Sequence, residues 1–217
     1  MSEAAICAGR SRTTWSDPGE GGDRQFSTRA AGGIAVCAGV DYREAGPLRN
    51  ACMSSPPSHA RALPPPRPAR SDEAARLWAL RTQAVRATCI SHYDAATVAA
   101  WSASPLPESY ARMIAAGGAV LIEEDGELLG YGIVDLDGAE VEAMFVDPAR
   151  GGRGLGARLM AEIDAIARAH GLPALTVASS LNAVAFYQAM GFRTIGEDAY
   201  AHPCGVSLAC VRMHKHL

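Results

Sequence analysis

A glycine-rich stretch between an apolar run and a helical pattern constrains the fold of this chain more than any other feature. The stretch reads FVDPARGGRGLGARLM and runs from residue 145 to residue 160. Glycines let backbone amides approach a ligand closely, and a helix start adds unpaired N–H groups and a partial positive charge. A strand, a glycine loop and a helix N-terminus in this order predict a site for an anion such as a pyrophosphate, with Arg150, Arg153 and Arg158 at its rim.

Two familiar phosphate-binding loops do not fit this stretch. A P-loop ends in Gly-Lys-Ser/Thr, whereas GLGARL contains neither a lysine nor a hydroxyl for magnesium. A dinucleotide-binding fingerprint needs GxGxxG and an acidic residue at the end of the next strand. Here GRGLGA has a different spacing, and ALTVASS ends without an acid. A glycine-rich turn that binds nothing is the third interpretation at this point.

The composition narrows the class of protein. A net charge of −3 over 217 residues lacks the basic excess of a nucleic-acid-binding protein, so we expect no nucleic-acid partner. No apolar run approaches the roughly 20 residues of a membrane span, so we expect no membrane partner. The six cysteines form no CxxC pair and the N-terminus has no secretory pattern. We therefore expect a cytoplasmic protein with free thiols and no metal.

The first part of the chain differs from the rest. Residues 1–62 are rich in Gly, Ser, Arg and Pro without a helical or strand period, although GGIAVCAGV could form one strand. The proline-rich segment 54–72 cannot continue a helix or a central strand. We predict a poorly ordered N-terminal extension over residues 1–62 and one domain over residues 63–217. A second hypothesis is that Met53 is the true start of the natural protein.

Regular patterns begin at Ser71. The segment 71–89 predicts an amphipathic helix capped by Ser71, and segments 94–103 and 107–117 predict two shorter helices that start near Asp94 and Pro107. The apolar face expected for the first helix comprises Ala75, Leu77, Trp78, Leu80, Ala84 and Val85.

Strand patterns follow the helices. Segments 119–125, 127–136 and 139–147 alternate as strands, and Asp-Gly pairs between them indicate hairpins. The remaining segments predict a helix, a strand, a helix and a terminal antiparallel pair, namely 156–171, 174–179, 182–192, 192–202 and 207–217. We expect an α/β (α+β) fold: a mixed, mostly antiparallel twisted sheet, flanked by helices, with a central strand–helix–strand crossover.

Two motifs on these elements resemble those of the GNAT superfamily of N-acetyltransferases. VDPARGGRGLGARL resembles the superfamily's acyl-CoA pyrophosphate loop, (Gln/Arg)-x-x-Gly-x-(Gly/Ala), and NAVAFYQAMGF resembles its FYxxxGF helix. The resemblance covers about residues 64–217. It implies the GNAT fold and acetyl-CoA as cosubstrate.

The resemblance also implies which residues contact CoA. Gly151 stands where a Gln or Arg is usual, with Arg150 one residue earlier, and Ser180 stands where an Asn is frequent. Asn182 lies two residues on and has a second interpretation as a helix N-cap. The implied contacts are the backbone of Met144, Phe145 and Val146 for the oxyanion and pantetheine, and Gly151, Gly152, Arg153, Gly154, Leu155, Gly156, Ala157, Ser180, Asn182 and Tyr187 for the rest of CoA.

Acetyl transfer to an amine needs a base, an oxyanion site and an acid for the leaving thiolate. The resemblance gives the acid as Tyr187, whose alternative role is packing on its helix. Strand alternation places Glu140, Glu142 and Met144 on one face and Val141, Ala143 and Phe145 on the other. Glu142 or Glu140 is therefore the candidate base, with a solvated strand face as the alternative.

The acceptor pocket is expected from the first helices and the last strand pair. His92, Tyr93 and Trp101 are its candidate substrate-binding residues, and Cys89 is expected to be a buried thiol. The function predicted is direct acetyl transfer to a primary amine of a small molecule or protein, and the acidic net charge mildly disfavours an acidic acceptor. A non-catalytic acyl-CoA-binding or regulatory module and a nucleotide-binding oxidoreductase are the alternatives. A homodimer is left open.

Overall fold

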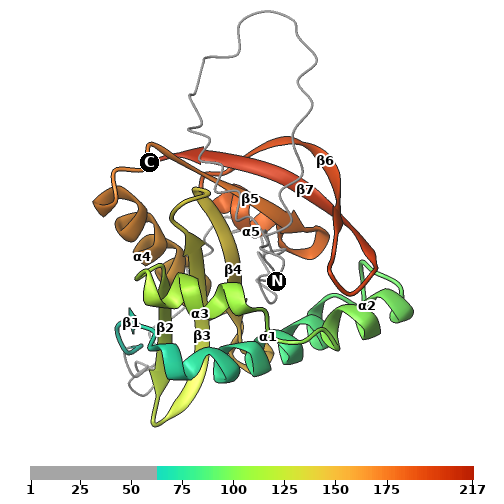
Figure 1. Cartoon of the computed structure of the whole chain (residues 1–217), viewed down its shortest axis with the longest axis horizontal. Coiled ribbons are helices and arrows are strands. Elements are labelled where there is room, and N and C mark those ends of the chain that lie inside the picture. The colour runs from blue at the N-terminus through green and yellow to red at the C-terminus, as the bar shows by residue number, and fades with distance from the viewer. Residues whose placement is uncertain (1–62) are drawn as a thin grey trace, which may run out of the picture.

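Seven strands form one mixed sheet in the computed structural model, which describes residues 63–217 (Figure 1). The order across the sheet is β1-β2-β3-β4-β5-β7-β6, and every neighbouring pair is antiparallel except β4 and β5. The predicted fold class is confirmed. The predictions for residues 1–62 lie outside the described residues. The strands are β1 (Arg67–Pro68), β2 (Ala119–Glu124), β3 (Glu127–Asp135), β4 (Glu140–Val146), β5 (Ala174–Ser180), β6 (Arg193–Ala201) and β7 (Ser207–His216).

The described helices lie close to the predicted segments, and none of them is long and apolar enough to cross a membrane. Asp94 caps the second helix as predicted, because its carboxylate accepts a hydrogen bond from the Thr97 N–H at 2.9 Å. The helices are α1 (Ala74–Thr88), α2 (Ala95–Ser102), α3 (Glu108–Ala115), α4 (Leu155–Ala169) and α5 (Val184–Ala189), with the short 3-10 turns η1 (Ser71–Glu73), η2 (Pro148–Arg150) and η3 (Leu181–Ala183).

The predicted start of the first helix is wrong. Ser71 lies in η1 and does not cap a helix, whereas Glu73 occupies the N-cap position of α1. The Glu73 carboxylate accepts hydrogen bonds from the guanidinium of Arg67 at 2.7 and 2.9 Å and from the Arg70 N–H at 2.8 Å. Arg67 also donates to Glu123 on β2 at 2.8 Å. This ion-pair network holds the edge strand β1 and the start of α1 against the sheet.

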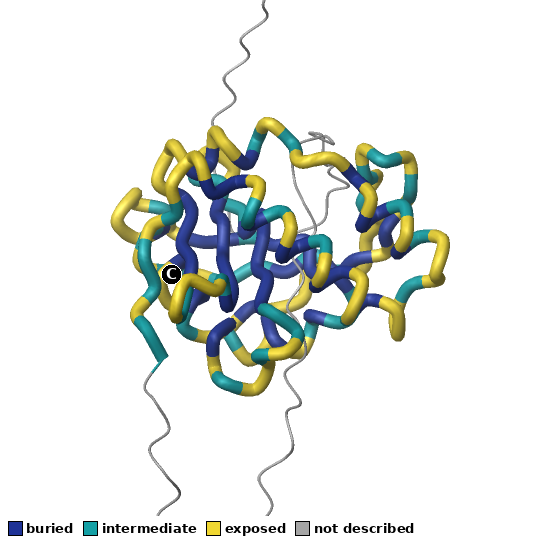
Figure 2. The backbone as a smooth tube through the Cα atoms, turned by 90° about the horizontal axis from the view of Figure 1, so that it is seen from below, coloured by how far each residue is buried: buried dark blue, intermediate teal, exposed yellow. Residues whose placement is uncertain are grey.

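Two hydrophobic cores lie on opposite faces of the sheet, and the central strands are buried between them (Figure 2). Helix α4 covers one face and contacts β2, β3 and β4, while α1 and α3 cover the other. The apolar face predicted for α1 holds at Leu77, Leu80, Ala84 and Val85, which are buried. The predicted face is wrong at Ala75, which is exposed. The charged Arg81 lies on the buried face of the helix instead.

Candidate functional site

Strands β4 and β5 open into a wedge. They run parallel, but their register covers a single pair, Glu140 with Thr176. Beyond that pair the two backbone edges are not paired with each other, although β3 and β7 pair with their outer edges. The carboxyl ends of diverging parallel strands form a crevice, which is the usual place for a ligand in such a sheet.

The glycine loop sits at the carboxyl end of β4, beside this wedge. Gly152 and Gly154 adopt φ values of 75° and 76°, and Gly154 is the N-cap of α4. The Arg158 N–H donates to the Gly154 carbonyl at 3.2 Å. The amides of residues 155–157, in the first helical turn, come before this bond along the chain. Such amides and the positive helix end are the groups that the predicted anion site requires.

Each arginine at the loop has a partner elsewhere in the fold. Arg150 pairs with Glu127 at 3.2 Å and Arg153 with Glu124 at 3.6 Å, both at the β2–β3 hairpin. Arg158 donates to the Leu63 carbonyl at 2.9 Å. Such half-exposed ion pairs contribute little free energy, so Arg150 and Arg153 can exchange these carboxylates for a phosphate at small cost.

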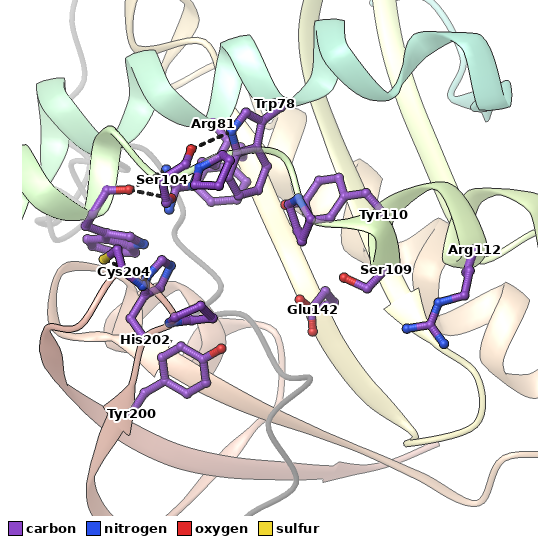
Figure 3. Close-up of a pocket in the computed structure, with 15 residues that line it drawn as sticks. Trp78, Arg81, Ser104, Ser109, Tyr110, Arg112, Glu142, Tyr200, His202 and Cys204 are labelled. Carbon is purple, nitrogen blue, oxygen red and sulfur yellow. Dashed lines mark hydrogen bonds between the residues drawn. The ribbon is translucent and has the colours of Figure 1, made fainter. Parts of the chain in front are cut away.

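A cavity of about 270 Å³ lies on the α1 and α3 face of the sheet. Its walls come from α1, from α2, α3 and the segment that joins them, from β4, and from the end of β6 with the turn that follows (Figure 3). Much of the wall is aromatic, with Trp78, Trp101, Tyr110, Phe145 and Tyr200. Polar groups converge among these rings, which is the usual composition of a small-molecule site.

A β-bulge aims Glu142 into this cavity. The β3–β4 register steps from Ile133–Ala143 directly to Val134–Val141, so Glu142 is the extra residue on β4. Bulges re-aim a side chain and occur beside active sites. Glu142 is only 5% exposed and lines the cavity.

The bulge corrects the predicted strand alternation. Val141 packs in the same core as Met144, while Ala143 and Phe145 pack in the opposite core, on the cavity side with Glu142. The prediction that Met144 shares a face with Glu142 is therefore wrong. Strict two-residue alternation fails because one extra residue in the strand reverses the phase of the pleat.

Glu140 does not line the cavity. Its carboxylate accepts a hydrogen bond from Arg212 on β7 at 3.0 Å, and Arg212 also donates to Asp198 on β6 at 3.1 Å. Burial raises the pKa of Glu140, and the Arg212 charge opposes that effect. Glu140 therefore ties β4 to the terminal strand pair, whereas Glu142 faces the cavity.

His202 and Cys204 form a second polar group in the cavity wall, which the sequence patterns did not indicate. The Cys204 N–H donates to Nδ1 of His202 at 3.2 Å, and the Cys204 sulfur lies 2.8 Å from the same nitrogen. Burial, aided by the Arg81 charge, lowers the pKa of His202 to about 4. The imidazole is therefore neutral at physiological pH.

The comparisons with known proteins agree with this geometry. Residues 89–215 match the acetyltransferase (GNAT) domain family. The chain belongs to the GNAT acetyltransferase family. No curated protein matches the chain.

Solved structures of GNAT proteins share the fold. A GCN5-related N-acetyltransferase from Rhodopseudomonas palustris has a TM-score of 0.65 and 23% identity, over 74% of this chain and 99% of that one. The PaiA N-acetyltransferase from Thermoplasma acidophilum, in complex with coenzyme A, has a TM-score of 0.56 and 16% identity, over 70% and 98%. YncA from Salmonella typhimurium, solved with its cofactor acetyl-CoA, has a TM-score of 0.50 and 22% identity, over 70% and 92%.

The GNAT helix that carries Tyr187 packs into the core beside the wedge. Tyr187 is 0% exposed, and its ring meets Phe186 and Phe192 edge-on at centroid distances of 5.1 and 5.4 Å. Gly156 of the glycine loop faces the same helix, because a Cβ there would lie 2.9 Å from the Phe186 ring. The glycine loop and the Tyr187 helix, far apart in sequence, therefore lie against each other.

Other residues that the GNAT resemblance singled out lie near the end of β5. Ser180 ends β5 and is buried. The Asn182 amide contacts Thr88 at 3.4 Å and Cys89 at 3.7 Å, so it bridges η3 to the end of α1. The N-cap interpretation of Asn182 is wrong, because Ala183 holds that position. Cys89 is buried as predicted, and burial raises the pKa of its thiol to about 11.

The three predicted substrate-binding residues separate in this GNAT fold. Trp101 lines the cavity, whereas His92 is exposed outside it. The Tyr93 hydroxyl donates to the Ala209 carbonyl at 2.7 Å and accepts from the Leu181 N–H at 3.0 Å, so it joins β7 to η3. The sequence patterns did not indicate Arg81 as a cavity residue, although its spacing of three residues from Trp78 places both on one helical face.

Proposed function

We propose that this GNAT chain transfers an acetyl group from acetyl-CoA directly to a primary amine of a small molecule or protein, within a ternary complex. The observation that carries the proposal is the position of β4, which borders both the wedge and the cavity. One edge of β4 borders the wedge beside the glycine loop, and its bulge aims Glu142 into the cavity on the face. A thioester in the wedge and an amine in the cavity would meet at this strand.

The wedge and its glycine loop suit acetyl-CoA. The loop amides and the start of α4 would bind the pyrophosphate, and Arg150 and Arg153 would add charge. The backbone groups of Met144 and Val146 on β4 would receive pantetheine and the oxyanion. Those of Phe145 point to β3, in step with the Asp147 N–H that donates to the Leu129 carbonyl at 2.8 Å. The neighbouring structures with coenzyme A or acetyl-CoA support this cosubstrate.

Glu142 is the base in this proposal. It is the carboxylate in the cavity wall, and removal of a proton from the incoming ammonium leaves the nitrogen lone pair free to attack. His202 is a weaker candidate, because burial and Arg81 hold its pKa at about 4. Glu140 is also a weaker candidate for the base, because its carboxylate is ion-paired with Arg212.

The remaining steps use the backbone and Tyr187. The amine nitrogen attacks the thioester carbonyl and a C–N bond forms. The nitrogen then releases its remaining extra proton to water, and the tetrahedral oxyanion collapses with cleavage of the C–S bond. Tyr187, on the helix that packs against the glycine loop, would donate a proton to the leaving CoA thiolate. The products are an N-acetylated amine and free CoA.

An amine screen with thiol detection tests the proposal. Purified protein, acetyl-CoA and a panel of small-molecule and peptide amines should release CoA thiol only when a suitable amine is present. Calorimetric binding of acetyl-CoA without thiol release across the panel would instead support the acyl-CoA-binding module. Binding of NAD in place of acetyl-CoA would overturn both.

A further inference from the structure

Arg81 is a buried cation without an acidic partner among the described residues. It lies on α1, is 2% exposed and lines the cavity. Its guanidinium donates one hydrogen bond, to the Trp101 carbonyl at 2.8 Å. It lies 4.3 Å from the ring centroid of Trp78 and 5.6 Å from that of Trp101. No ion pair joins it to an Asp or Glu within residues 63–217.

This burial is costly for the protein alone. A charge removed from water destabilises the fold unless it is paired and hydrogen-bonded. The guanidinium has five N–H donors, and one carbonyl and two aromatic faces compensate it only in part. Burial accordingly lowers the pKa of Arg81. An anion in the cavity would supply the missing charge and accept bonds from the remaining donors.

The cavity also contains the opposite charge at another wall. Glu142 comes from β4 and Arg81 from α1, with Tyr110 of α3 on the wall as well (Figure 3). Burial is the main cause that raises the pKa of Tyr110, and the hydrogen bond with Tyr131 opposes it. Glu142 adds a smaller increase and Arg81 a smaller decrease, so both charges lie near this ring. Arg112 adds a second guanidinium at the exposed end. The cavity wall therefore contains both positive and negative groups beside its aromatic rings.

We infer that the acceptor is an amino-acid-type zwitterion, whose carboxylate Arg81 binds while its amine faces Glu142. This inference rests on the proposed acetyl transfer and names the substrate class for the same site. The aromatic walls suit an apolar side chain, and a cavity of about 270 Å³ suits a single amino acid. A zwitterion carries no net charge, so the acidic balance of the chain does not oppose its approach.

A purely structural role for Arg81 makes a different prediction. If the guanidinium only braces Trp78 and Trp101, its loss would weaken the pocket for every amine alike. If it binds a carboxylate, its loss would affect acceptors that carry a carboxylate and spare those in which that group is neutral. Matched pairs of ligands separate these roles.

The experiment compares free amino acids with their carboxamides. Leucine and phenylalanine are tested against leucinamide and phenylalaninamide, with kcat/KM measured by CoA release for the wild type, Arg81→Gln, Arg81→Lys and Arg86→Gln. A carboxamide has the less basic amine, which alters its intrinsic reactivity equally in every variant, so the change in the acid-to-amide ratio between the wild type and Arg81→Gln reports carboxylate binding. Arg86 is the matched control, because it lies on the same helix, is exposed and bonds Ser102 outside the cavity.

We expect the wild type and Arg86→Gln to favour the acid by at least about tenfold, equivalent to about 1.4 kcal/mol. Arg81→Gln should bring that ratio near one while the KM for acetyl-CoA stays within about twofold. Arg81→Lys should retain part of the preference, because it keeps the charge and loses the planar fork. If thermal melting shows that Arg81→Gln does not fold, the acid-to-amide ratio of Arg81→Lys tests the inference in its place.

The contrary outcomes are distinct. Equal kcat/KM for acid and amide in the wild type, or an equal loss for both in Arg81→Gln, overturns the inference and leaves the acetyl transfer standing. If no amine releases CoA, the proposed function fails instead. Calorimetric titration of phenylalanine and phenylalaninamide into the acetyl-CoA-saturated protein then decides: binding of the acid alone, lost in Arg81→Gln, supports the carboxylate site, and any other pattern rejects it.

Discussion

The wedge beside the glycine loop and the cavity beneath α1 lie on either side of β4, and they are built from different parts of the chain. The loop side uses backbone amides, glycines and one helix start, all within one continuous stretch. The cavity side uses side chains from α1, the α2–α3 segment, β4 and the β6–β7 turn. A cosubstrate whose structure is the same in every reaction can be bound by a local motif. An acceptor would instead be recognised by side chains that only the fold brings together.

The largest effect that would test this division is expected at Glu142. Glu142→Gln should lower kcat by about 1,000-fold, because the amine loses its base, while the KM for acetyl-CoA changes by less than about twofold. Steady-state kinetics with the best amine of the panel measures both. Glu140→Gln is the control, since Glu140 pairs with Arg212 outside the cavity. A larger loss in Glu140→Gln would reverse the assignment of the base.

A smaller kinetic effect is expected on the other side of β4, at Tyr187. Tyr187→Phe keeps the ring contacts with Phe186 and Phe192 and removes the hydroxyl. We expect kcat to fall by about 100-fold, since the thiolate loses its acid, with acetyl-CoA affinity by calorimetry within about twofold. Unchanged turnover would reduce Tyr187 to a packing residue.

A glycine substitution should affect acetyl-CoA alone. Gly154→Ala meets no atom within 4 Å, but it forces a side chain into φ 76° at the cap of α4. That strain costs about 1 kcal/mol or more, so we expect the KM for acetyl-CoA to rise by about fivefold to tenfold and the acceptor KM to stay constant. Gly196→Ala, which also has open space but no positive φ, should change neither. A rise in acceptor KM with Gly154→Ala would contradict the separation of the two sides.

The remaining effect concerns stability rather than kinetics, and its dependence on pH. Arg67 first, then the Arg70 N–H, lower the pKa of Glu73 to about 2, although burial opposes them. The ionised carboxylate therefore stabilises the fold fully above its ordinary pKa of 4.5, and this contribution is lost as the pH falls toward 2.

Glu73→Gln should accordingly lower the free energy of unfolding at pH 7 by about 2 kcal/mol. Urea unfolding at several pH values should show the difference from the wild type shrinking below pH 4.5. Because α1 carries Trp78 and Arg81, acceptor KM should rise while acetyl-CoA binding is preserved. A difference that grows on acidification would contradict the ion-pair account.

The sequence patterns predicted the sheet, its crossover and the glycine loop well, for physical reasons. Strand alternation, Asp-Gly turns and helix caps are local, and the Asp125–Gly126 turn has the positive φ values, 52° and 83°, that such hairpins need. Two of the failures were also local in origin. The prediction that Ser71 caps the first helix was wrong, because Glu73, which Arg67 binds, occupies the N-cap of α1. The prediction that Met144 shares a face with Glu142 was wrong, because one bulge shifts the phase of β4.

By itself, the sequence determined the element order, the position of the glycine loop before α4 and the GNAT family, because each depends on neighbours along the chain. Only the tertiary structure decided which carboxylate faces the cavity and which buried cation lies in the wall of the same cavity. Arg81 appeared in sequence as one basic residue on a helix, and it becomes distinctive only when Trp78, Trp101 and the sheet exclude water from it. Desolvation gives a charge its chemical role, and desolvation is a property of the packed fold.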